Sequence, residues 1–122
     1  MSSKRILIID DEVAILDALK LVLEGRGHQI CTVSRPEDFS SSLEIFQPEV
    51  IFVDLSMPGM DGVTVTKRIK TDPGTRHIPV IVISAHLDTE QRAREAGADD
   101  YLEKPFRVND FLAKVTALCE RT

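Results

Sequence analysis

Short apolar runs and amphipathic stripes alternate along the chain, and this alternation limits the possible fold more than any other feature. Each run has the length of a buried β-strand, and the stripes show the spacing of helices with one apolar face. Strands that alternate with helices form parallel sheets through right-handed crossovers. We therefore predict an α/β protein whose parallel sheet is covered by helices on both faces. The predicted strands are residues 6–9, 29–33, 50–54, 80–83 and 99–103, and the stripes include Ile15, Leu19, Leu23, Phe39, Leu43, Phe46, Val65, Ile69, Ala93, Ala96, Val108, Phe111, Leu112, Val115 and Leu118.

Length and composition predict one domain, residues 1–122, with no output domain in this chain. At 122 residues and 43% hydrophobic content, the chain can bury a core without metals or disulfides. Its net charge of -5 and scattered basic residues argue against direct nucleic-acid binding. Cys31 and Cys119 match no disulfide or metal spacing, and the first apolar run is too short for a signal peptide or a membrane span. We therefore expect a cytoplasmic protein without membrane contact.

Polar side chains follow several predicted strands at the point where each strand ends. Asp54 ends the apolar run 50–53, Asp10 and Asp11 follow the first run, and Ser84 follows the fourth. Lys104 comes directly after the last strand. In open α/β sheets, ligands bind at the carboxyl ends of the strands. We therefore expect these side chains to meet at one edge of the sheet and to form the functional site.

The acidic residues at this edge suit a divalent metal ion. Asp10 and Asp11 facing Asp54 would repel one another unless a cation lay among them, and Mg²⁺ prefers hard oxygen ligands. Taken alone, the Asp10-Asp11 pair is better explained by helix capping, because Asp11 just precedes a predicted helix. Asp54 is different, since a carboxylate that ends a buried strand is costly to desolvate without a partner.

A metal-bound aspartate can act as a nucleophile towards phosphorus, with a lysine balancing the charge on the phosphoryl oxygens. Asp54 and Lys104 fit these two roles, and Ser84 could donate a hydrogen bond to the same oxygens. Taken singly, Ser84 would more often be a cap or turn residue, and Lys104 a solvated surface lysine. Their combination with Asp54 favours a phosphoryl-transfer site.

Four motifs follow one another along the chain: Ile-Ile-Asp-Asp-Glu at 8–12, Val-Asp-Leu-Ser-Met-Pro-Gly-Met-Asp-Gly at 53–62, Ile-Ser-Ala at 83–85, and Ala-Gly-Ala-Asp-Asp-Tyr-Leu-Glu-Lys-Pro-Phe at 96–106. Together they resemble the receiver domain of two-component response regulators, and the match extends over essentially the whole chain. The resemblance implies a flavodoxin-like three-layer sandwich, with five helices and a five-stranded parallel sheet in the order 2-1-3-4-5.

The resemblance also implies a function and its partners. Asp54 would accept a phosphoryl group from a phosphohistidine on a sensor histidine kinase or a histidine phosphotransfer protein, and the domain would then act on an unknown downstream effector. Mg²⁺, with Mn²⁺ as a substitute, would be held by Asp11, Asp54 and the backbone carbonyl of Ser56, with Asp10 acting largely through water. No small-molecule turnover is expected beyond self-phosphotransfer and autodephosphorylation.

The same resemblance implies a conformational switch. Ser84 and Lys104 would bind the phosphoryl group, Tyr101 would move between exposed and buried rotamers, and the Lys104-Pro105 peptide bond would be cis. A half-buried tyrosine on an edge strand is also explained by β-propensity alone. The interval from Ser84 to Gly97 is shorter than is usual in the family, which predicts a short or displaced fourth helix. That shortening puts the family's phosphorylation-dependent dimer in doubt.

Other interpretations fit the sequence less well. A phosphatase of the haloacid dehalogenase type needs a second acid where this chain has Ser56, and a nucleotide or flavin binder needs a glycine-rich phosphate loop, which is absent. The main alternative is a receiver-shaped docking module that acts without phosphorylation. His28, His77 and His86 share no ligand spacing and are expected on the surface.

Overall fold

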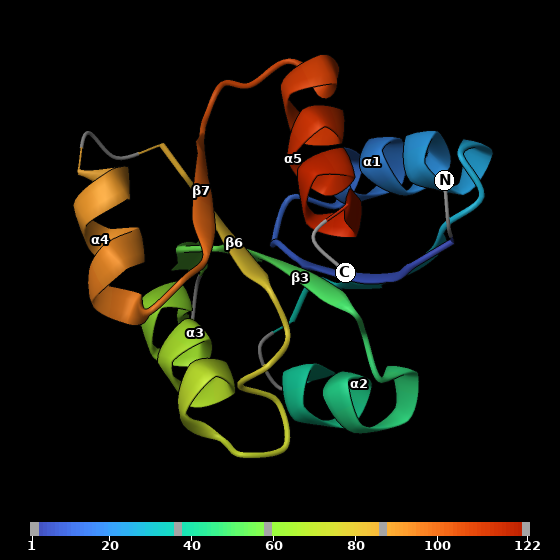
Figure 1. The fold of residues 1–122 in the computed structure, drawn as a ribbon. Coiled ribbons are helices and arrows are strands. Elements are labelled where there is room, and N and C mark those ends of the chain that lie inside the picture. The colour runs from blue at the N-terminus through green and yellow to red at the C-terminus, as the bar shows by residue number, and fades with distance from the viewer. Residues whose placement is uncertain (1–2, 36–37, 58–59, 86–87, 121–122) are drawn as a thin grey trace.

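The computed structural model describes residues 3–35, 38–57, 60–85 and 88–120. Within these residues, five helices surround a five-stranded sheet, and a short two-stranded hairpin follows the third strand (Figure 1). In chain order, the elements are β1 Arg5–Ile9, α1 Val13–Gly25, β2 Gln29–Val33, α2 Phe39–Phe46, β3 Val50–Asp54, β4 Ser56–Met57, β5 Met60–Asp61, α3 Gly62–Thr71, β6 Val80–Ser84, α4 Thr89–Ala96, β7 Asp100–Glu103 and α5 Val108–Glu120.

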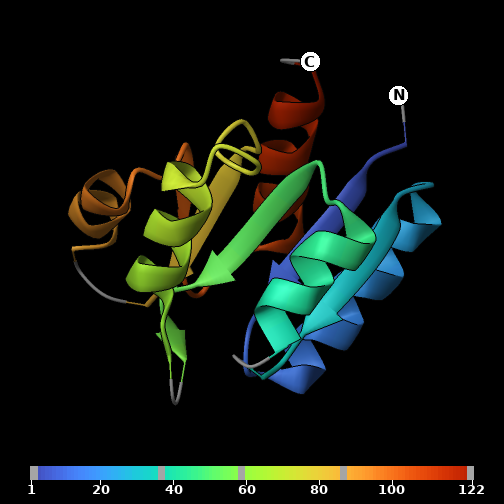
Figure 2. The same cartoon turned by 90° about the horizontal axis from the view of Figure 1, so that it is seen from below.

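The five main strands are parallel and lie in the order β2-β1-β3-β6-β7. This is the predicted order 2-1-3-4-5 when the β4–β5 hairpin is set aside. The central strands β3 and β6 are buried along their whole length, as expected for strands covered on both faces. Arrowheads of β1, β2 and β3 point the same way in Figure 2, so their carboxyl ends lie at one edge. The α/β prediction and the strand order are confirmed.

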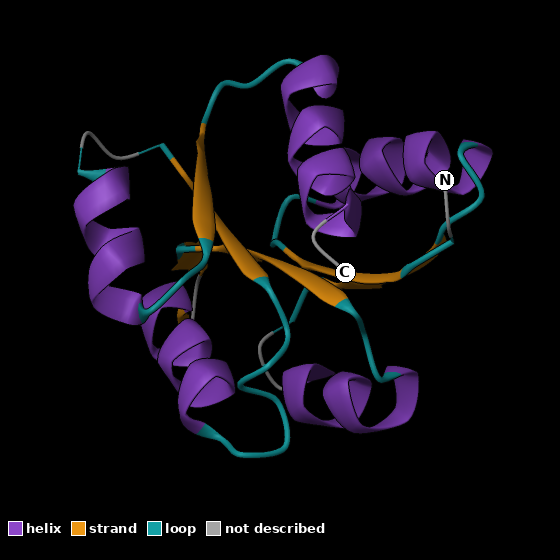
Figure 3. Ribbon diagram, in the orientation of Figure 1, coloured by secondary structure: helices purple, strands orange, loops and turns teal. Residues whose placement is uncertain are grey.

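Helices cover the sheet in two layers, with α1 and α5 on one face and α2, α3 and α4 on the other (Figure 3). Successive residues of a strand point to opposite faces. Ile6 and Ile8 accordingly pack in the cluster with α1 and α5, whereas Leu7 and Ile9 pack in the cluster with α2 and α3. The sheet is therefore the middle layer of a three-layer sandwich.

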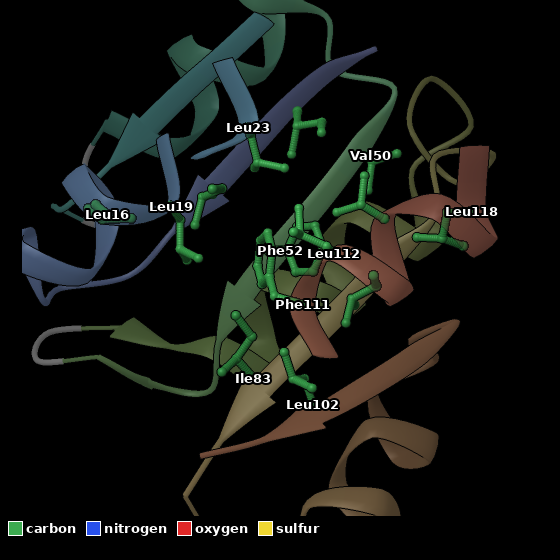
Figure 4. Packing of buried hydrophobic residues seen from close by; sticks show 14 residues of the cluster. Leu16, Leu19, Leu23, Val50, Phe52, Ile83, Leu102, Phe111, Leu112 and Leu118 are labelled. Carbon is green, nitrogen blue, oxygen red and sulfur yellow. The ribbon is translucent and has the colours of Figure 1, made fainter. Parts of the chain in front are cut away.

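Phe52 lies at the centre of the core beneath α1 and α5 (Figure 4). Its ring stacks on the ring of Phe111 from α5, with 4.3 Å between the centroids, and both side chains are fully buried. The ring of Phe106 also stacks on Phe111, with 5.9 Å between the centroids. Because Phe52 is two residues before Asp54, this aromatic packing holds the strand whose end carries that carboxylate.

Two details differ from the sequence analysis or refine it. The prediction that His28 lies at the surface is wrong: His28 is buried, and its Nδ1 atom accepts a hydrogen bond from the backbone N–H of Lys4 at 3.1 Å, a contact between segments distant in the sequence that no local pattern shows. His77 is exposed as expected, and His86 lies outside the described residues. Helix α4 has only 8 residues, which agrees with the short interval between Ser84 and Gly97.

Of the helices in the described part of the chain, none combines the length and hydropathy that a membrane span requires.

Candidate functional site

The strand register brings the predicted polar residues together. Ile9 pairs with Val53, so Asp10, directly after β1, lies at the same level as Asp54, the last residue of the adjacent strand β3. On the other side of β3, Asp54 pairs with Ile83, which places Ser84 next to the same edge. All three polar side chains are buried, with exposures of 1% for Asp10, 3% for Asp54 and 0% for Ser84. The backbone N–H of Lys104 donates to the Ser84 carbonyl at 2.8 Å and joins the end of β7 to this group.

The Lys104 ammonium lies among carboxylates. Its Nζ donates to Oε1 of Glu12 at 2.9 Å, to Oδ2 of Asp54 at 3.2 Å and to Oδ2 of Asp10 at 3.3 Å. A lysine ammonium has three N–H donors, so these contacts use all of them. The lysine side chain is only 15% exposed, and water therefore screens these interactions weakly. A single positive charge thus opposes three negative ones in a mostly buried cluster.

The imbalance of charge changes the protonation of the cluster. Burial raises the pKa of the Asp10 carboxyl from its ordinary 3.8 to about 6, and the nearby Asp54 charge acts in the same direction. The backbone N–H of Glu12 and the Lys104 ammonium oppose this shift in the pKa of Asp10. For Lys104, burial alone would lower the pKa, but hydrogen bonding to Glu12 and the charges of Asp10 and Asp54 raise it above its usual range. Lys104 therefore keeps its proton at neutral pH.

The raised pKa of Asp10 predicts that this carboxylate destabilises the folded protein at neutral pH. Between pH 3.8 and about 6 the folded state binds more protons than the unfolded state, so the stability of the wild type falls as the pH rises through this interval. Asp10→Asn should remove the penalty and increase the free energy of unfolding by about 1–3 kcal/mol at pH 7, with almost no gain below pH 4. Urea unfolding at several pH values, without divalent cations, measures this difference.

Asp17→Asn is the matched control for Asp10, because Asp17 is exposed on α1. It should leave the pH profile of stability unchanged. If Asp10→Asn is less stable than the wild type at pH 7, the charged Asp10 carboxylate does not destabilise the folded protein and the prediction is wrong.

The carboxylates have the chemistry of a magnesium site. Oxygen atoms of Asp10, Glu12 and Asp54 all lie within 4.8 Å of one another. These oxygens already surround one cation, the Lys104 ammonium. Carboxylate oxygens are also the hard ligands that Mg²⁺ prefers. The donor set therefore fits the predicted metal ion.

The structure does not place every predicted ligand in this cluster. Asp11 is exposed and lies outside the group of oxygens, whereas its neighbour Glu12 lies inside it. Ser56 lies in β4, two residues after Asp54, and pairs with Asp61 across the hairpin. The N-cap residue of α1 is Glu12, whose side chain makes no capping hydrogen bond, and Asp10 accepts the backbone N–H of Glu12 at 2.9 Å.

Glu12 is the site residue that the sequence analysis did not assign. The sequence did contain a sign of its role, because Glu12 is the third acidic residue of the first motif and stands just before α1. The spacing alone could not show that its side chain, rather than that of Asp11, would turn towards Lys104.

Gly62, the first residue of α3, packs closely against the backbone of Asp54 and Leu55. Its N–H donates to the Leu55 carbonyl at 3.1 Å, and a Cβ atom at this position would overlap the backbone of Asp54 and Leu55. The preceding residue, Asp61, caps α3 by accepting the Val63 N–H at 3.0 Å. Helix α3 can therefore begin directly against the end of β3.

The predicted switch residues Ser84 and Tyr101 lie on the adjacent strands β6 and β7. The Lys104-Pro105 peptide bond is cis, as the family resemblance implied. Tyr101 is half-buried on β7, and the Lys114 ammonium of α5 lies 5.7 Å from the centre of its ring. Lys114 also donates to both carboxylate oxygens of Asp100 at 3.0 Å. Tyr101 therefore lies at the contact between β7 and α5.

Comparisons with known proteins identify the family. The family model "Response regulator receiver domain" matches residues 6–116. The chain is 39% identical over 120 residues to the DNA-binding dual master transcriptional regulator RpaA of Synechocystis, covering 97% of this chain and 50% of that protein. The chain spans about half the length of the curated relatives it matches.

Solved structures show the same similarity. The signal receiver domain of a DNA-binding response regulator from Colwellia psychrerythraea has a TM-score of 0.89 and 32% identity, covering 97% of this chain and 99% of that one. The signal receiver domain of a signal transduction histidine kinase from Syntrophus aciditrophicus also has a TM-score of 0.89, with 31% identity and coverages of 98% and 92%. The match to both the family model and these structures shows that the chain belongs to the receiver domain family of two-component response regulators.

Proposed function

We propose that Asp54 is the phosphoacceptor of this receiver domain and that it takes its phosphoryl group from a phosphohistidine of a partner protein. The observation that carries the proposal is the contact of the Lys104 ammonium with Asp54 inside a buried acidic cluster. A carboxylate nucleophile beside a cation at the carboxyl edge of the sheet is the arrangement that phosphoryl transfer requires.

Phosphoryl transfer to Asp54 exchanges the P–N bond of the donor for a P–O bond. A carboxylate oxygen of Asp54 attacks phosphorus, the P–N bond of the phosphohistidine breaks, and the leaving imidazole nitrogen takes up a proton. Lys104 binds the phosphoryl oxygens and balances their charge, and the Ser84 hydroxyl donates to them. Water later attacks phosphorus, which restores the Asp54 carboxylate and releases phosphate. This self-dephosphorylation is the only turnover proposed, in keeping with receiver domains, which are generally not classical enzymes.

Receiver domains bind Mg²⁺ at an acidic pocket, and the acidic cluster of this chain suits that ion. We propose Asp10, Asp11, Asp54 and the Ser56 carbonyl as its ligands, with Mn²⁺ as a substitute. When bound, the ion neutralises negative charge on the carboxylates and on the phosphoryl oxygens. The contact of Asp10 with the Lys104 ammonium supports this proposal, because it shows that the cluster already binds a positive charge.

Response regulators of this kind interact with sensor histidine kinases and have downstream effector domains. We propose such a kinase, or a histidine phosphotransfer protein, as the phosphodonor, and residues 1–122 as one receiver domain. The proposal includes a cytoplasmic location, because a free cysteine such as Cys31 suits a reducing compartment. A phosphorylation-dependent dimer is also proposed, with the short α4 as the element that would alter its geometry.

The first test is intact mass spectrometry after incubation with acetyl phosphate, with and without Mg²⁺. We expect a Mg²⁺-dependent gain of one phosphoryl group that is lost in base, as for an acyl phosphate. A protein phosphodonor should be tested in parallel, since some receivers accept only from their partner. Absence of any gain from either donor would favour the docking module that acts without phosphorylation.

Lys104→Ala should separate phosphoryl acceptance from the conformational response. Without the ammonium, Asp54 can still be phosphorylated, but no cation draws the end of β7 towards the phosphoryl group. We expect a phosphorylated mass at a reduced rate, together with loss of the phosphorylation-induced change in amide hydrogen exchange of β6 and β7. Lys67→Ala, on the exposed face of α3, is the control and should respond like the wild type. A full exchange response in Lys104→Ala would refute the coupling.

A further inference from the structure

Lys104 has no spare hydrogen-bond donor in the described structure. Its three N–H groups already point to Asp10, Glu12 and Asp54, from two different strand ends and the start of α1. If Lys104 is to bind a phosphoryl group, as proposed above, one of these carboxylates must release it. The identity of the released carboxylate sets how easily the lysine changes partner.

The three carboxylates differ in how tightly they are held. Asp10 is 1% exposed and is anchored by the Glu12 backbone N–H at 2.9 Å. Asp54 is 3% exposed and is itself the group to be phosphorylated, so it stays beside the lysine. Glu12 is different, because its side chain is 53% exposed and can rotate into water, although its contact with Lys104 is the shortest of the three at 2.9 Å. Glu12 is therefore the partner that can leave at least cost.

We propose that Glu12 is a positioning residue that competes with the phosphoryl group for Lys104. In the unphosphorylated domain its carboxylate holds the ammonium, and on phosphorylation a phosphoryl oxygen replaces it. The inference rests on the proposed function, because it assigns the alternative partner of the same lysine. It also separates Glu12 from Asp10 and Asp54, whose oxygens surround the lysine in both states.

The backbone of Glu12 is independent of this competition. Its carbonyl accepts the N–H groups of Ile15 at 3.0 Å and Leu16 at 3.1 Å, which start α1. Glu12→Gln keeps these hydrogen bonds and the size of the side chain while it removes the charge that pairs with Lys104. The variant should therefore fold like the wild type, which unfolding in urea would verify.

The test uses the affinity of the 122-residue chain for beryllofluoride, a non-covalent phosphoryl analogue, at saturating Mg²⁺. Glu12→Gln should bind it about threefold to tenfold more tightly, the effect expected from loss of one competing charge-assisted hydrogen bond. Glu103→Gln is the matched control, because Glu103 is exposed and adjacent to Lys104 in sequence but lies outside the carboxylate cluster. It should change the affinity little.

A double-mutant cycle distinguishes competition from a general effect of charge or structure. In a Lys104→Ala background there is no ammonium to compete for, so adding Glu12→Gln should no longer tighten binding. If Glu12→Gln tightens binding equally with and without Lys104, the proposed competition is wrong.

Two further outcomes would overturn the inference. Weaker binding of both Mg²⁺ and beryllofluoride by Glu12→Gln would make Glu12 a metal ligand, and an unchanged affinity would mean that the contact has no influence on the site. In either case the wild type would still bind the analogue and gain a phosphoryl group on Asp54, so the proposed function would stand. Failure of the wild type in both assays would overturn the function and the inference together.

Discussion

Asp54→Asn is expected to abolish phosphoryl acceptance while the domain stays folded. An amide oxygen is a far weaker nucleophile than a carboxylate oxygen, and the wild-type side chain is buried next to a lysine whose charge it shares. Asparagine has nearly the same shape, so the packing of β3 should be preserved. Intact mass after treatment with acetyl phosphate and Mg²⁺ should show no added phosphoryl group.

Asp17→Asn provides the control for Asp54, because it makes the same chemical change at an exposed position of α1. It should gain the phosphoryl group like the wild type. Urea unfolding should also show that Asp54→Asn is cooperatively folded, so that loss of the reaction is not loss of the fold. A base-labile adduct forming on Asp54→Asn at the wild-type rate would show that another residue is the acceptor.

Gly62→Ala should cause a large loss of stability at the same end of β3. A methyl group at this position would overlap the Asp54 carbonyl oxygen and the Leu55 Cα, and would lie 2.9 Å from the Asp54 carbonyl carbon. These are backbone atoms, so the chain itself must move to relieve the overlap. We expect a decrease of about 2–4 kcal/mol in the free energy of unfolding. Urea denaturation measures this change.

The matched control is Gly25→Ala, at the end of α1, where a Cβ would meet nothing within 4 Å. Alanine has the higher helix propensity, so this variant should be neutral or more stable by up to about 1 kcal/mol. Phosphorylation of any folded Gly62→Ala should be slower, because the backbone that must shift carries Asp54. A Gly62→Ala variant as stable as Gly25→Ala would mean that the start of α3 adjusts freely.

The fold was predictable because its signals are local and repeated. Each strand is a short apolar run, and its alternating residues pack in the hydrophobic clusters on the two faces of the sheet. In β1, for example, Ile6 packs on one face and Leu7 on the other. Helices with one apolar face leave few arrangements other than a covered parallel sheet. The same reasoning placed Asp10, Asp54, Ser84 and Lys104 at one edge, because parallel strands end together.

Other features depended on contacts between distant segments. His28 follows a glycine turn in the sequence, but it is buried and accepts a hydrogen bond from the backbone N–H of Lys4, which is 24 residues earlier in the chain. The β4–β5 hairpin comprises only two residues on each side, too few to show a period in the sequence.

Hydrophobic periodicity and parallel connectivity are properties of the chain, so the layers and the edge where the reactive groups meet followed from the sequence pattern, whereas the strand order was implied by the resemblance of the motifs to the receiver family. Which carboxylates contact Lys104, in contrast, depends on how distant parts of the chain pack together. Asp11 and Glu12 are neighbours of the same charge, and only the direction of the chain between β1 and α1 turns Glu12 towards the ammonium and leaves Asp11 exposed. The Coulomb energy between two charges falls with the distance between them, so an ion pair forms only where separate elements bring the two groups within a few ångströms. No sequence pattern encodes these distances.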